Sequence, residues 1–79
     1  GLIMELKALF AAILNIDESL LHDDSGPGNL GAWTSKIHFE LVAAMEEIYR
    51  IRLTRREIRA MTTLGAARRL VESKLMAGG

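Results

Sequence analysis

Residues 34–49, Thr-Ser-Lys-Ile-His-Phe-Glu-Leu-Val-Ala-Ala-Met-Glu-Glu-Ile-Tyr, decide the fold of this chain. The apolar side chains among them recur at spacings of three and four residues, which is typical of one face of an amphipathic α-helix. The face that we expect to point inward comprises Ile37, Leu41, Ala44, Met45 and Ile48, flanked by Phe39 and Val42. Either Thr34 or Ser35 can cap the beginning of this helix, because a side-chain oxygen accepts hydrogen bonds from the free N–H groups of a first turn.

Three further helices are predicted around this one. An apolar face upstream predicts a helix over roughly residues 3–15; its members are Leu2, Leu6, Leu9, Phe10, Ile13 and Leu14. Downstream, Thr54 and Glu57 form a T-x-x-E capping box, which predicts a short third helix through about Met61. Thr62 or Thr63 is expected to cap a fourth helix, with an inward face of Leu64, Ala67, Leu70 and Val71.

Two segments lack helical spacing. Residues 17–29 are rich in Asp, Ser, Gly and Asn, so we expect a long loop up to about residue 34, with Trp33 packed where it meets the helix. Residues 50–53 alternate charged and apolar side chains without a partner strand, which predicts an extended link. The expected fold is therefore all-α: one domain over residues 1–79, a four-helix bundle with three longer helices, one short helix and a long loop after the first.

The composition excludes several classes of site. The chain has no cysteine, which excludes disulfides, thiolate zinc sites and a cysteine nucleophile. Its two histidines are His22 and His38, and no HExxH motif, P-loop or nucleophile elbow is present. The run His22-Asp23-Asp24 is interpreted as a solvated acidic loop, since adjacent residues rarely converge on one metal ion. We therefore expect no metal site and no enzyme activity.

Charge and hydropathy argue against two classes of partner, nucleic acids and membranes. The net charge is zero, but residues 1–34 carry −4 and residues 35–79 carry +4. This balance argues against general nucleic-acid binding, which needs a broad basic surface. No apolar run approaches the roughly 20 residues of a membrane span, and no secretory signal pattern is visible. A cytoplasmic monomer without a nucleic-acid or membrane partner is expected.

Ser35 is the candidate functional residue. It follows a Gly-rich loop and opens an amphipathic helix. The unpaired N–H groups and the positive dipole end of a helix N-terminus favour a phosphate group there. A plain N-cap serine is the alternative interpretation, and helix physics alone favours it because capping serines are common.

From Leu30 to about Val71 the chain resembles the acyl carrier proteins. Their signature, Asp-Ser-Leu at the start of the second helix, corresponds here to Thr34-Ser35-Lys36. At the spacing of the family, further matches are Glu40-Leu41, Met45-Glu46-Glu47, Tyr49, Ile51, Leu53, Glu57-Ile58 and Thr63-Leu64. Trp33 before this triplet and His38 after it are similar to the W-[DT]-S-L-x-H beginning of some free-standing carriers of specialised pathways.

The resemblance implies a carrier. A separate phosphopantetheinyl transferase would move 4'-phosphopantetheine from coenzyme A onto the Ser35 hydroxyl. The thiol of that arm would hold an acyl group as a thioester, in a specialised lipid or polyketide-type pathway. The implied partners are acyl-loading, condensing or acyl-transfer enzymes.

The resemblance also implies where partners dock. Glu40, Glu46 and Glu47 match the acidic face that partners of the family contact. Lys36 departs from the pattern, because it stands where the family has a Leu that contacts partners. We interpret Lys36 as a residue that pairs with the phosphodiester or changes which partner docks.

A second class of function stays open. The second half of the chain contains a basic stretch, Arg50, Arg52, Arg55, Arg56 and Arg59. It could contact nucleic acid or a protein in a small helical binding module with unmodified Ser35. Solvent-exposed arginines interleaved with core residues Ile51, Leu53 and Ile58 are the plainer interpretation.

Overall fold

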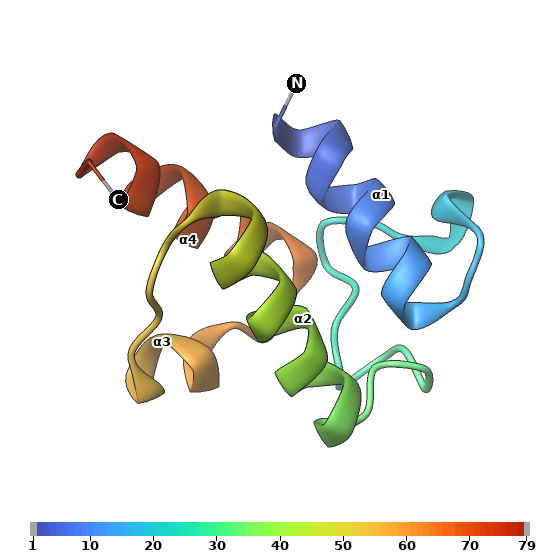
Figure 1. Cartoon of the computed structure of the whole chain (residues 1–79). Helices are drawn as coiled ribbons and strands as arrows, with labels where there is room; N and C mark the ends of the chain where they lie inside the picture. The colour runs from blue at the N-terminus through green and yellow to red at the C-terminus, as the bar shows by residue number, and fades with distance from the viewer. Residues whose placement is uncertain (1, 79) are drawn as a thin grey trace.

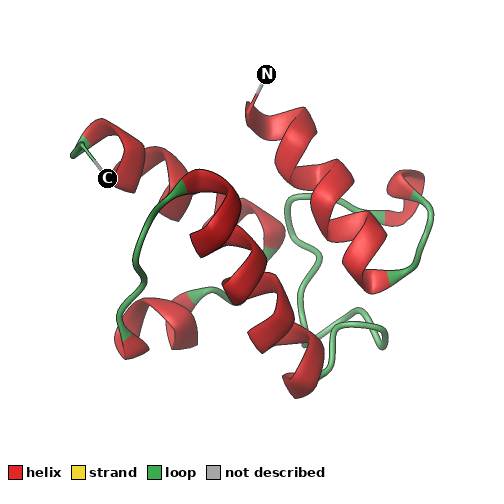
Figure 2. Cartoon of the chain, viewed as in Figure 1, coloured by secondary structure: helices red, strands yellow, loops and turns green. Residues whose placement is uncertain are grey.

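The computed structural model describes residues 2–78, and the side chains of residues 5–78. It contains α1 (Leu2–Leu14), α2 (Ser35–Tyr49), α3 (Arg55–Ala60) and α4 (Leu64–Met76), joined by loops as Figures 1 and 2 show. No strand occurs between residues 2 and 78. The all-α prediction, with three longer helices, one short helix and a long loop after the first, is confirmed. None of the helices described is long and apolar enough to cross a membrane.

Threonine side chains cap the N-termini of three of the helices. Thr34 and Thr63 each accept a hydrogen bond from the backbone N–H three residues on, at 3.2 and 3.0 Å. At α3, Thr54 accepts from the Glu57 N–H at 3.1 Å, and the Glu57 carboxylate accepts from the Thr54 N–H at 2.8 Å. This is the predicted capping box, and the hydrogen bonds hold the pKa of Glu57 below its usual value. Each cap satisfies helix donors that otherwise lack a partner.

The core lies between α1, α2 and α4, which pack on one another, while α3 lies to one side (Figure 1). Its buried side chains are Leu6, Phe10, Ala11, Leu14, Leu21, Trp33, Leu41, Val42, Met45, Ile51, Met61, Leu64, Ala67 and Val71. Trp33 is 2% exposed, and its ring meets that of Phe10 edge to face with centroids 5.5 Å apart. Trp33 therefore anchors the junction between the long loop and α2, as predicted.

The inward face of α2 is rotated from the predicted one. Ile48 was expected inside but is 57% exposed, whereas Val42, expected at the edge, is 5% exposed. Successive residues of an α-helix are about 100° apart. The buried face is centred on Leu41, Val42 and Met45, so Ile48 lies at its margin and in the last turn.

The loop after α1 is fastened to the beginning of α4. The carbonyl oxygens of Asp23 and Ser25 accept hydrogen bonds from the N–H groups of Gly65 at 2.9 Å and Leu64 at 2.8 Å. The Asp23 carboxylate also accepts two hydrogen bonds from Arg68, at 2.6 and 2.8 Å. These bonds hold the pKa of Asp23 below its usual value.

Over the chain as described, no group of three or more His, Asp or Glu side chains is placed to hold a metal ion.

Candidate functional site

Ser35 is the first residue of α2 and is exposed, while Thr34 is the N-cap. The interpretation of Ser35 as a plain capping serine is therefore wrong, because the hydroxyl that receives the Ile37 N–H belongs to Thr34. Lys36 follows Ser35 and is also exposed. The Ser35 hydroxyl is thus accessible to another protein.

A cavity of about 220 Å³ opens beside Ser35. Ser35 and Phe39 line it from α2, and Pro27 lines it from the long loop. Arg59 and Met61 line it from α3 and the turn that follows. Sequence reasoning found Ser35 but not this cavity, because its walls come from three separate segments.

A hydrogen-bonded chain ties α2 to α3 at this cavity. The indole N–H of Trp33 donates to Nδ1 of His38 at 2.9 Å, and Nε2 of His38 lies 2.8 Å from the carbonyl oxygen of Ile58. Trp33 can only donate and a carbonyl can only accept. His38 is therefore neutral in this arrangement, with its proton on Nε2, and it holds α3 against α2.

Replacing His38 with Phe should destabilise the fold by about 1–3 kcal/mol, because the buried indole N–H of Trp33 loses its acceptor. Urea unfolding followed by circular dichroism measures this loss. His22→Phe is the matched control, since His22 is exposed, and it should change the free energy of unfolding by less than about 0.5 kcal/mol. Equal losses for the two variants would contradict the structural role of His38.

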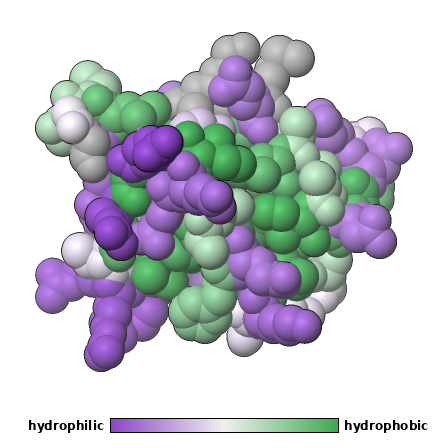
Figure 3. All heavy atoms as spheres, in the orientation of Figure 1, coloured by the Kyte–Doolittle hydropathy of each residue, from purple (hydrophilic) through white to green (hydrophobic). Residues whose placement is uncertain are grey.

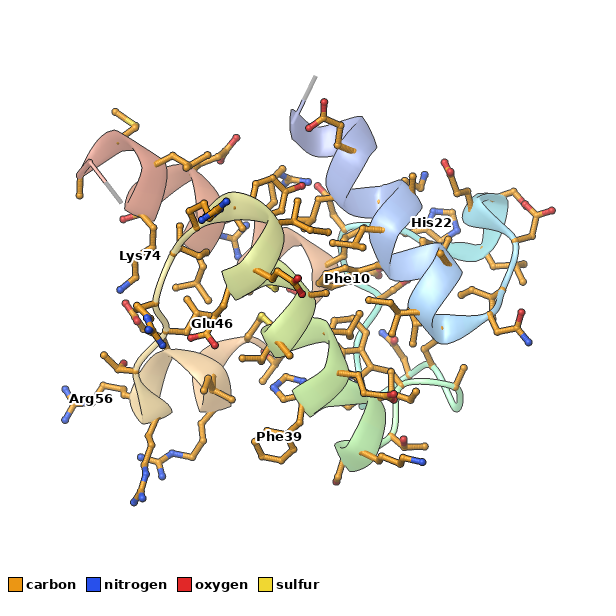
Figure 4. All side chains as sticks on the ribbon, in the orientation of Figure 1. Phe10, His22, Phe39, Glu46, Arg56 and Lys74 are labelled. Carbon is orange, nitrogen blue, oxygen red and sulfur yellow. The ribbon has the colours of Figure 1, made fainter. Side chains whose placement is uncertain are left out.

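The three glutamates of the predicted acidic face do not share one environment. Glu40 and Glu47 are exposed and lie seven residues apart on α2, which places them on the same side. Glu46 is half-buried, and its carboxylate accepts the Leu53 N–H at 2.9 Å. Its carbonyl oxygen accepts the Ile51 N–H at 3.2 Å. Glu46 therefore fastens the end of α2 to the link that follows, as its position in Figure 4 illustrates.

The arginines of the basic stretch lie at the end of α2, in the link and on α3. Its members, Arg50, Arg52, Arg55, Arg56 and Arg59, are all exposed. The two ion pairs among the side chains described, Arg68–Asp23 and Lys74–Glu57, include none of them. Hydrophilic side chains cover the corner of the molecule where α3 lies (Figure 3), and Arg56 points outward there (Figure 4). Of the three interleaved residues expected in the core, Ile51 is buried, while Leu53 and Ile58 are half-buried against it.

No protein-family model and no curated protein matches the sequence. Among solved structures, the chain is similar to the solution NMR structure of a holo acyl carrier protein from Geobacter metallireducens. The TM-score is 0.85 at 24% sequence identity, over 96% of this chain and 87% of that chain. The resemblance noted from Leu30 to about Val71 is thereby confirmed for the fold. The chain has the acyl carrier fold, with Ser35 at the beginning of its second long helix.

Proposed function

We propose that the protein is an acyl carrier that receives 4'-phosphopantetheine on Ser35. The observation that carries this proposal is an exposed hydroxyl at the first residue of α2 that the cap does not use, within an acyl carrier fold. The similar Geobacter protein is described as a holo form. The Ser35 oxygen would attack phosphorus in the diphosphate of coenzyme A. Its proton would pass to the transferase, and the nucleotide part would leave.

The residues around Ser35 fit such an arm. The first turn of α2 offers N–H groups toward a phosphodiester, and Lys36 and Arg59 add positive charge nearby. The arm supplies a thiol that holds an acyl group as a thioester. This chain itself would present the arm and be recognised, while partner enzymes perform the acyl chemistry in a specialised lipid or polyketide-type pathway.

Incubation with coenzyme A and a broad-specificity phosphopantetheinyl transferase tests this function. Intact-protein mass spectrometry should show the gain of one arm. The alternative, a helical module that contacts nucleic acid or a protein through its arginines, predicts no mass gain. Salt-sensitive binding to random duplex DNA, without loading, would favour that alternative.

We propose Glu40 and Glu47 as the acidic part of the docking surface and Lys36 as its selective part. All three are exposed on α2, within four turns of the helix that begins at Ser35. Glu47 also lines a shallow depression with Arg50 and Arg52, so a partner would meet both signs of charge there. Glu46 would support the docking surface by holding the link, and its reversal would test the link rather than docking.

Reversing Glu40 and Glu47 together to Lys should slow acyl transfer to a cognate enzyme about tenfold at low salt, because complementary charges speed association. The difference should shrink at high salt. Glu18→Lys with Asp24→Lys is the matched control, since it makes the same charge change at exposed positions of the long loop. Equal slowing in both pairs would contradict a docking role for α2. Transfer rates come from timed mass spectrometry, and circular dichroism checks helicity.

A further inference from the structure

The cavity beside Ser35 combines apolar walls with one cation. Phe39 and Met61 supply apolar wall, and Arg59 lines the cavity from α3. No carboxylate side chain is among the residues that line it. Phe39 is 63% exposed, and it projects from the beginning of α2 away from the core (Figure 4). An exposed aromatic side chain and an arginine that line the same cavity suit a ligand with an apolar body and an anionic end.

Arg59 sets the charge of this cavity. His38 also lines it, but both its ring nitrogens are occupied, Nδ1 by Trp33 and Nε2 by the carbonyl of Ile58. The ring is therefore neutral and has no N–H left for a ligand. Arg59 takes part in neither ion pair found among the side chains described. Its planar guanidinium can bind two oxygens of a carboxylate or a phosphate at once.

The volume indicates the size of the group that the cavity can hold. The cavity holds about 220 Å³. A water molecule takes up roughly 30 Å³ in the liquid, so the cavity accommodates a group of roughly seven non-hydrogen atoms. A four-carbon acyl group that ends in a carboxylate has this size, and so does a phosphate with its nearest substituents.

We propose that this cavity binds an anionic oxygen group of the loaded carrier through Arg59, with the exposed ring of Phe39 against the adjoining carbon atoms. The group is either the phosphodiester at Ser35 or the terminal carboxylate of a short acyl cargo. The inference rests on the proposed function, because the ligand arrives only when Ser35 is loaded. It makes Arg59 a residue that selects what the carrier holds against its own surface.

Four forms of the protein distinguish the two sources of the anion. They are the apo protein, the holo protein, and proteins loaded from butanoyl- and succinyl-coenzyme A, whose acyl groups share four carbons and differ in the terminal carboxylate. The readout is the NMR shift of the Arg59 side-chain Nε–H, compared with that of Arg56 on the same helix. A change several times larger at Arg59 in all loaded forms supports the phosphodiester. A change confined to the succinyl form supports the carboxylate.

Matched variants complete the test. Arg59→Gln should abolish the shift changes that loading causes at Phe39 and Met61, while Arg56→Gln should retain them, since Arg56 points outward (Figure 4). Both positions are exposed, so both variants should fold. Verified loading without any selective response at Arg59 would overturn this inference and leave the proposed function intact. Failure of Ser35 to load at all would overturn both.

Discussion

Ser35→Ala should abolish attachment of phosphopantetheine, whereas the unaltered chain gains one arm from coenzyme A and the transferase. The reason is chemical, because a methyl group has no oxygen to attack phosphorus. The fold should remain intact, since Thr34 supplies the N-cap of α2. Losing a cap costs about 1 kcal/mol, and Ser35→Ala should lose much less than that. Intact mass before and after incubation measures loading, and urea unfolding measures stability.

Thr34→Ala gives the opposite pair of results and serves as the control. It removes the hydroxyl that accepts the Ile37 N–H at 3.2 Å, so it should destabilise the protein by about 1 kcal/mol. It leaves the Ser35 hydroxyl in place, so at a temperature where the protein is folded it should still gain one arm. Loading that survives in Ser35→Ala would show that another group is the acceptor, and would end the assignment of Ser35.

The helices were predictable because the capping residues and the apolar spacing that define them lie within or directly beside each helix. Thr54 and Glu57 lie three residues apart, and their capping box depends on nothing outside α3. The apolar spacing of α1 and α4 likewise fixes which side must be covered. The exposure of Ile48 was not predictable in this way, because the margin of a buried face depends on where the neighbouring helices end.

The hydrogen bonds that join separate segments could not be predicted from the sequence pattern. The carboxylate of Glu46 matched an acidic docking motif, yet it accepts the N–H of Leu53 seven residues on. His38 likewise matched a motif, while its two hydrogen bonds join Trp33 to Ile58. Both contacts depend on how elements meet in space, and residue spacing along the chain does not report this.

The long loop shows the same limit. Its Asp, Ser and Gly content predicted a loop correctly, but not the 3-10 helix at Glu18–Leu20. Nor did it predict that Asp23 and Ser25 would satisfy the free N–H groups of α4. Tertiary contacts of this kind give a segment of turn-forming residues one defined structure. They also make one glycine of this loop critical for stability.

Gly26 is that residue, and Gly26→Ala is expected to have the largest effect on stability of any conservative change in the chain. A Cβ atom at Gly26 would lie 1.9 Å from the carbonyl oxygen of Thr62 and 2.9 Å from its carbonyl carbon. These are backbone atoms in the turn before α4, so they cannot rotate away as a side chain does. The loop must then move, which strains the hydrogen bond from Leu64 N–H to the Ser25 carbonyl, 2.8 Å long in the native fold.

The expected loss for Gly26→Ala is about 3 kcal/mol or more, since overpacking costs about 1–3 kcal/mol and a strained hydrogen bond adds about 1. A domain this small has a total stability of only about 5 kcal/mol, so the variant should retain about 2 kcal/mol or less, and its midpoint of urea unfolding should fall by about half or more. Gly28→Ala is the matched control two residues on, because its Cβ would meet nothing within 4 Å. Urea unfolding followed by the fluorescence of Trp33, the single tryptophan of the chain, compares the two. If Gly26→Ala proved as stable as Gly28→Ala, the loop would not pack against Thr62, and the wall that Pro27 gives to the Ser35 cavity would be misplaced as well.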